Sequence, residues 1–160
     1  MNAVLLITLS AGRLLAQSSD SGATYLLKDF DASQVGVCSK VQAVRAGDRK
    51  LSGLMLEITY QGTYRRTLAA YQDSTGNVAE YVEVLTSPEG QHVLLHTIAA
   101  RFLHDGQVRG LALTTVLSPS APNATGLGAR PRASRPLTSE EQERVRSLSR
   151  KVLHRCTNAS

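Results

Sequence analysis

Tryptophan is absent from this chain of 160 residues, and aromatic residues together make up only 4% of it. A hydrophobic core must therefore be built from Leu, Val, Ala and Ile. Hydrophobic residues account for 42% of the chain, which is enough for one globular domain of this length. No segment is charged enough to impose disorder on the whole chain.

Cysteine is almost as scarce, with Cys38 and Cys156 as the two examples. They form no C-x-x-C pair, so the ligands and spacing of a zinc site or a thioredoxin-like site are missing. In an oxidising compartment a disulfide between them is the simplest interpretation. Two unrelated buried thiols are the alternative.

The patterns of common catalytic and cofactor sites are also missing. No serine lies in a G-x-S-x-G elbow, and the glycines near residue 126 follow no expected strand, so they form no dinucleotide fingerprint. His92 and His96 would lie ~13 Å apart on a strand, too far to share a metal ion. We therefore predict no metal, no cofactor and no catalytic residue. An enzyme with a site assembled across strands is the alternative.

No apolar run is long enough to span a membrane, but residues 3–17 (AVLLITLSAGRLLAQ) have signal-peptide length. We predict a signal peptide over 1–16, a mature chain from Gln17, secretion or a periplasmic location, and no membrane span after processing. The first twelve residues lack Lys and Arg, so an ordinary first element or a misplaced start codon is the alternative. Asn123 and Asn158 begin formal glycosylation triplets, which matter only in a secreting eukaryote.

The net charge of +5 is unevenly distributed. Residues 130–155 hold the basic excess, whereas the preceding body is close to neutral. Because the body offers no basic surface, nucleic acid is not the expected partner. A basic-tailed adaptor that binds an anionic surface or nucleic acid is an alternative.

Alternating apolar residues separated by Gly, Asn, Asp and Pro clusters predict a mainly β fold over 17–117, an antiparallel meander of about seven strands in an open sheet or half-barrel. Asp105-Gly106 is the best hairpin signal, and Gln61-Gly62 a weaker one. The strands are expected at residues 23–30, 35–44, 51–60, 63–71, 78–86, 91–102 and 107–117.

The composition then changes. Residues 118–137 are rich in Ser, Pro and Arg and predict a flexible tether, and 138–156 predict a helix that packs on the sheet. Thr138 and Glu141 have capping-box spacing. The helix carries one narrow apolar stripe of Val145, Leu148, Val152 and Cys156.

One hairpin suggests a site. With a two-residue loop at Glu89-Gly90, Glu83 would pair directly with His96 as a polar anchor or a weak acid–base couple. Tyr81 and Tyr60 join them as candidate ligand-binding residues. Since no catalytic motif is present, we expect a binding domain for an apolar small molecule or an envelope protein.

Overall fold

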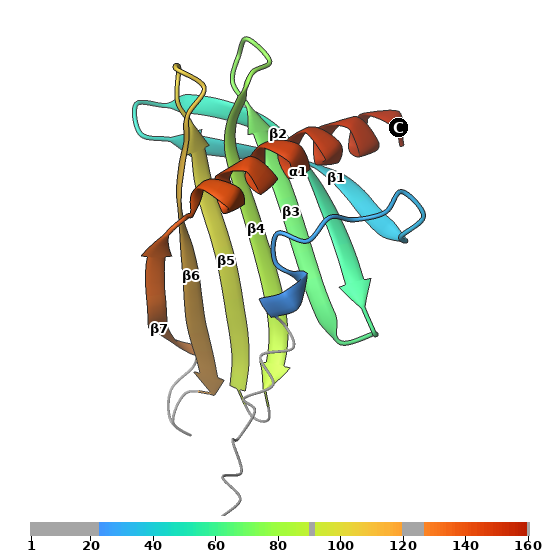
Figure 1. Cartoon of the computed structure of the whole chain (residues 1–160), viewed down its shortest axis with the longest axis vertical. Helices are drawn as coiled ribbons and strands as arrows, with labels where there is room; N and C mark the ends of the chain where they lie inside the picture. The colour runs from blue at the N-terminus through green and yellow to red at the C-terminus, as the bar shows by residue number, and fades with distance from the viewer. Residues whose placement is uncertain (1–22, 90–91, 120–126, 160) are drawn as a thin grey trace, which may run out of the picture.

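The computed structural model describes residues 23–89, 92–119 and 127–159, and these form one curved antiparallel sheet with a C-terminal helix (Figure 1). A short 3-10 turn, η1 (Ala23–Tyr25), precedes the sheet. The predicted signal peptide lies outside the described residues. The strands are β1 (Gly36–Arg45), β2 (Arg49–Tyr60), β3 (Tyr64–Gln72), β4 (Val78–Glu89), β5 (His92–Phe102), β6 (Val108–Pro119) and β7 (Leu127–Pro136), followed by helix α1 (Ser139–Asn158).

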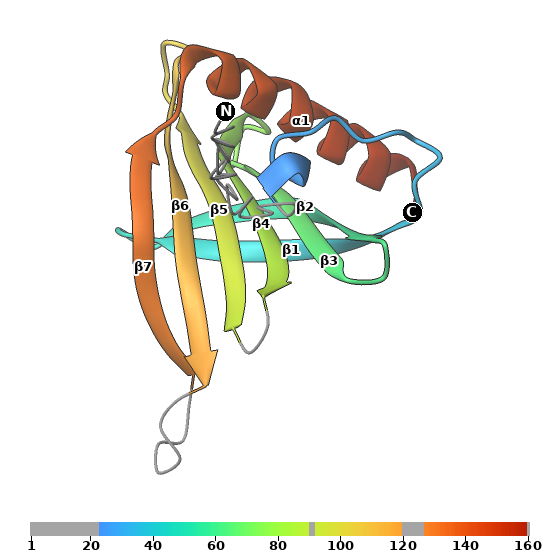
Figure 2. The same ribbon diagram turned by 60° about the horizontal axis from the view of Figure 1, so that its bottom comes forward.

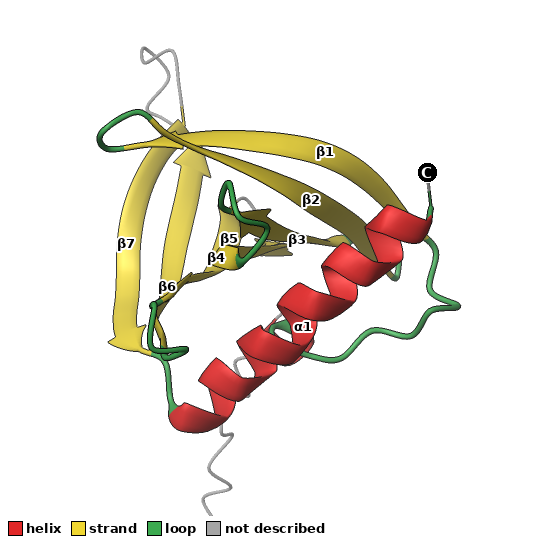
Figure 3. Cartoon of the chain, turned by 90° about the horizontal axis from the view of Figure 1, so that it is seen from above, coloured by secondary structure: helices red, strands yellow, loops and turns green. Residues whose placement is uncertain are grey.

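The predicted fold class is confirmed: each strand pairs with its neighbours in sequence, in the order β1 to β7. Side chains alternate between a face that α1 covers and an outer face. On β2, Leu56 and Ile58 belong to the core, and Leu54 and Tyr60 pack against it, as the alternation predicts. Seen from above, β1 and β2 run at a steep angle to β6 and β7, and the helix crosses the remaining side (Figure 3).

Helix α1 begins as its sequence predicts. The Thr138 side chain accepts a hydrogen bond from the Glu141 backbone, and the Glu141 side chain accepts one from the Thr138 backbone. The apolar stripe is buried against the sheet, with Val145 and Val152 completely enclosed. No helix in the described ranges is long and apolar enough to cross a membrane.

The predicted disulfide is present between Cys38 of β1 and Cys156 of α1, with their Cα atoms 5.4 Å apart. The bond joins the first strand to the last turns of the helix. Together with the buried stripe, it fixes α1 along one end of the sheet (Figure 2).

The prediction of a strand at residues 23–30 is wrong. After η1, the segment 26–34 runs beside α1 and inserts Leu27 and Phe30 into the core. Cations on the helix hold it there: Lys151 donates to Asp29, and Arg155 donates to the carbonyls of Asp31 and Gln34. The backbone carbonyls are therefore satisfied by the helix and not by a neighbouring strand.

The flexible tether predicted at 118–137 is also wrong over Leu127–Pro136, which forms β7 beside β6. An edge strand needs backbone hydrogen bonds on one side only, so it tolerates prolines and polar side chains. Backbone pairing thus orders a segment that its apolar content alone does not. Residues 120–126 of the predicted tether lie outside the described ranges.

Candidate functional site

The predicted direct pairing of Glu83 with His96 is wrong. Glu83 pairs with Ile98, and His96 pairs with Leu85, because the ladder continues to Glu89 and His92. This shifts the register by two residues, and an even shift leaves every side chain on its predicted face. Glu83 and His96 therefore both lie on the face toward α1, as diagonal neighbours on adjacent strands.

Glu83 is the centre of a buried hydrogen-bond network. Its Oε1 accepts from Nε of Arg66 over 2.6 Å and from the backbone N of Leu27 over 2.9 Å. Its Oε2 accepts from the hydroxyl of Tyr81 over 2.7 Å, and Nη1 of Arg66 donates to the hydroxyl of Tyr60 over 3.1 Å. Three of the four predicted site residues thus belong to one network, in which Tyr81 contacts Glu83 directly and Arg66 links Tyr60 to Glu83. Sequence reasoning missed Arg66.

This network belongs to the core, since the side chains of Arg66, Glu83 and Tyr81 are all completely buried. Burial, and then the charge of Glu83, raise the pKa of Tyr81 well above its usual value. Burial acts to lower the pKa of Arg66, but Glu83 outweighs it and raises that pKa. The network therefore contains one ion pair, Arg66 with Glu83, and Tyr81 is neutral within it.

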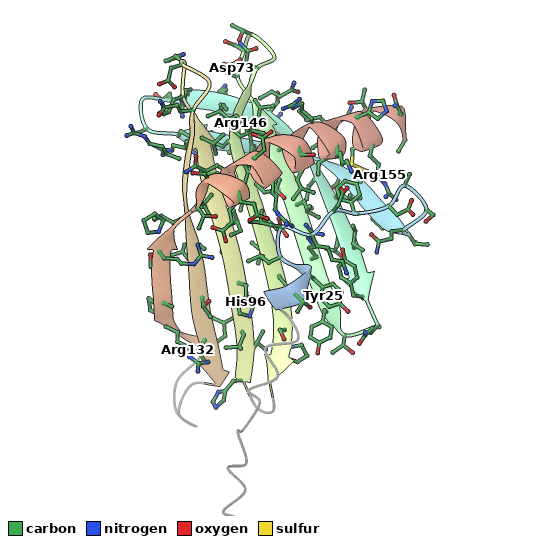
Figure 4. The ribbon with its side chains drawn as sticks, in the orientation of Figure 1. Tyr25, Asp73, His96, Arg132, Arg146 and Arg155 are labelled. Atoms are coloured by element: carbon green, nitrogen blue, oxygen red, sulfur yellow. A yellow bond between two sulfur atoms is a disulfide. The ribbon has the colours of Figure 1, made fainter. Side chains whose placement is uncertain are left out.

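His96 lies on β5, opposite Leu85 of β4, and is 5% exposed (Figure 4). Its Nδ1 is 3.4 Å from the hydroxyl of Thr114 on β6. The position of Glu83 and His96 on one buried face is established. A role for either in ligand binding stays a prediction.

The outer face of the sheet carries a second cluster, centred on Glu80. Nη2 of Arg45 lies 2.7 Å from this carboxylate, Nη2 of Arg49 lies 3.4 Å away, and Nε of Arg101 lies 3.7 Å away. The Glu80 side chain is only 6% exposed. Its hydrogen bond with Glu80 raises the pKa of Arg45. One carboxylate therefore serves three guanidinium groups, which leaves a local excess of positive charge and of N–H donors.

A further arginine extends this excess. Arg109 of β6 is directly opposite Arg101 of β5, on the same outer face. Like charges in this arrangement repel each other, because opposed Cβ atoms lie only ~5 Å apart. Arg109 is exposed and has no ion-pair partner among the described residues. Two arginines are thus cross-strand neighbours, and among the described residues Glu80 is the carboxylate that pairs with one of them, Arg101.

These arginines border a groove of about 750 Å³ on the outer face, which we call the outer groove. Its floor is apolar and comes from three neighbouring strands and the entry to α1. Leu103 and Leu111 in its wall are 36% and 45% exposed and add to the apolar surface that it presents. The groove is lined chiefly by Arg45, Glu80, Val82, Ala99, Arg101, Leu103, Arg109, Leu111, Pro136 and Leu137.

A second pocket of about 660 Å³ lies at the end of the sheet, between α1 and the β3–β4 and β5–β6 loops. Arg146 and Arg150 of the helix line it, together with Arg49 and Arg101. Its acidic residue, Asp73, accepts hydrogen bonds within its own loop, chiefly from the Thr75 side chain, and these lower its pKa. Arg101 thus lies between two cationic cavities.

No local sequence pattern indicates the Glu80 cluster, because its members come from four strands. The correct register would have revealed the opposed pair of Arg101 and Arg109. Within the described ranges, no group of His, Cys, Asp or Glu is arranged to hold a metal ion.

No protein-family model matches the chain, and no curated protein or solved structure matches it either. Function is therefore inferred from the chemistry of these sites.

Proposed function

We propose that this chain is an exported binding domain for a small molecule that combines an apolar body with one acidic group. The outer groove holds the ligand. The observation that carries the proposal is the opposed pair of Arg101 and Arg109 in the lining of an apolar groove, where Glu80 is the one carboxylate among the described lining residues.

The acidic group binds between the two arginines. Guanidinium groups form charge-assisted, often bidentate hydrogen bonds to carboxylate, sulfonate or phosphate oxygens. An anion at this place also removes the repulsion between Arg101 and Arg109. Binding therefore combines a new attraction with the relief of an unfavourable contact.

The apolar body lies along the groove floor, against Val82, Ala99 and Leu111. Its burial releases water from these side chains, which stabilises the complex by roughly 25 cal/mol per Å² of apolar surface. A groove of this volume falls within the ~300–1,000 Å³ typical of small-molecule sites. The two parts of the groove together select amphipathic anions over neutral or fully polar molecules.

A pair of fluorescent probes tests this. Anilinonaphthalene sulfonate and phenylnaphthylamine share an aromatic framework, but only the first carries an acidic group. We expect the sulfonate to bind more tightly, and Arg109→Glu to weaken it by roughly tenfold or more while the neutral probe changes little. Leu111→Asp should weaken both probes.

Arg132→Glu on β7 is the matched control, because it makes the same charge change at a residue that does not line the groove. Equal affinity for both probes, or equal losses in the two arginine variants, would show that binding is not directed by the opposed pair. Fluorescence titration at several salt concentrations gives these affinities.

Export is the second part of the proposal. It rests on the apolar run at 3–17 and on the disulfide, which is typical of oxidising compartments. Sequencing the N-terminus of the native protein should give a start near Gln17. An intact Met1 on correctly localised protein would contradict export by this route.

A further inference from the structure

The two edges of the sheet differ in how they are protected against further pairing. The β7 edge (Leu127–Pro136) contains two prolines and three arginines, and its ladder shifts register at Thr114/Thr115. Prolines, charges and irregularities of this kind block the addition of another strand. The β7 edge is thus closed to a partner.

The β1 edge is less protected, although it carries two charges, Lys40 and Arg45. It pairs with β2 over ten consecutive residues without a register shift and contains no proline. Val37 and Val44 are 68% and 63% exposed, and Val35, just before the strand, is 89% exposed. A long, regular edge with exposed apolar side chains presents unpaired backbone groups to another strand.

We propose that this edge binds the β1 edge of a second copy, antiparallel and about a two-fold axis at Val41. In this register Val41 faces its own copy, Lys40 faces Gln42, and Val37 faces Arg45. No like charges are opposed. A register that places Lys40 opposite Lys40, or opposite Arg45, would bring two cations together.

The second copy suits this edge because the strand is complementary to itself. Cys38 and Val44, which share the helix-facing side, become cross-strand neighbours, so the exposed Val44 is covered. Two seven-stranded sheets then join into one continuous sheet, and each unpaired backbone group on the facing edges gains a partner.

The register makes opposite predictions for two variants at one exposed position. Val37→Glu would face Arg45 of the second copy and should tighten the dimer, whereas Val37→Lys should weaken it. Because the contact occurs twice per dimer, we expect the dissociation constants of the two variants to differ by roughly tenfold or more. Sedimentation velocity over a concentration series measures these constants for the chain with its disulfide intact.

Ser134→Lys on the opposite edge is the control and should leave the dissociation constant unchanged. Circular dichroism and thermal unfolding establish that each variant is folded. A chain that stays monomeric at all concentrations would overturn the proposal. So would a dimer that responds equally to Val37→Glu and Val37→Lys, since its interface would lie elsewhere.

Discussion

Nε of Arg66 on β3 donates to Oε1 of Glu83 on β4 over 2.6 Å, and solvent reaches neither side chain. The pair also holds the backbone of Leu27 through Glu83 and the hydroxyl of Tyr60 through Arg66. Nη2 of Arg66 is buried and has no hydrogen-bond partner among the described residues. The pair is thus central to the packing of the N-terminal segment, although it is not fully satisfied.

Breaking this pair should be costly. Glu83→Gln or Arg66→Met alone should lower the free energy of unfolding by about 3–5 kcal/mol, because each leaves a buried partner uncompensated. The double variant should lose clearly less than the sum of the two. Urea unfolding of the four proteins measures the coupling. Additive losses would show that the pair contributes no interaction of its own.

Glu80→Gln should have opposite effects on binding and stability. The change removes the carboxylate that competes with a bound anion for Arg45, Arg49 and Arg101. We expect affinity for the sulfonate probe to rise and thermal stability to fall, since the guanidinium groups then repel one another. Affinity that falls with stability would indicate that Glu80 orders the groove and does not compete with the ligand.

Protonation of Glu141 should lower the stability of the fold at low pH. Two hydrogen bonds from Arg135 are the main cause that lowers the pKa of Glu141 from 4.5 to about 2. Since the pKa is lower in the folded state, this stabilisation is complete above pH 4.5 and is lost as the pH falls toward 2. Arg135 is 55% exposed, so solvent screening limits the loss to about 1 kcal/mol.

Thermal unfolding between pH 6 and 2 tests this, with Glu141→Gln as the comparison. The variant should be less stable than the parent at pH 6, and the difference should shrink as the pH falls. A constant difference across the range would contradict the assignment, because it would arise from packing and not from the carboxylate charge.

Loss of the disulfide should destabilise the chain more than any surface change. Cys38 and Cys156 are separated by 118 residues, and the chain-entropy estimate for a loop of this size is about 5 kcal/mol. The Cys38→Ser/Cys156→Ser double variant should show this loss in urea unfolding, measured against the parent under oxidising and reducing conditions. A parent whose stability does not change on reduction would contradict this expectation.

Much of the fold could be predicted because its causes are local. Alternation in β2 and the capping residues of α1 act over a few residues, and the structure confirms both. Turn types were harder to predict from the sequence. Gln61 and Gly62 both have positive φ (51° and 67°), as the weaker hairpin signal required, whereas at the preferred Asp105-Gly106 site Gly106 has positive φ and Asp105 does not.

The remaining errors concern interactions between distant parts of the chain. The segment around Leu27 takes its hydrogen bonds from Glu83 and the helix, and β7 is ordered by β6; neither partner is visible in the local sequence. The outer groove was missed for the same reason. The two-residue error in the β4–β5 register separated Glu80 from Arg101, its cross-strand partner.

The meander has a consequence for synthesis. Every strand of the sheet pairs with a neighbour in sequence, so the sheet can assemble as the chain emerges. Its inner face, however, is covered by α1, a helix of 20 residues that is the last element to be synthesised. Until that helix arrives, Leu56, Leu68 and Ile98 have no cover from it. We therefore expect a nascent or C-terminally truncated chain to expose this apolar surface and to aggregate more readily than the complete domain.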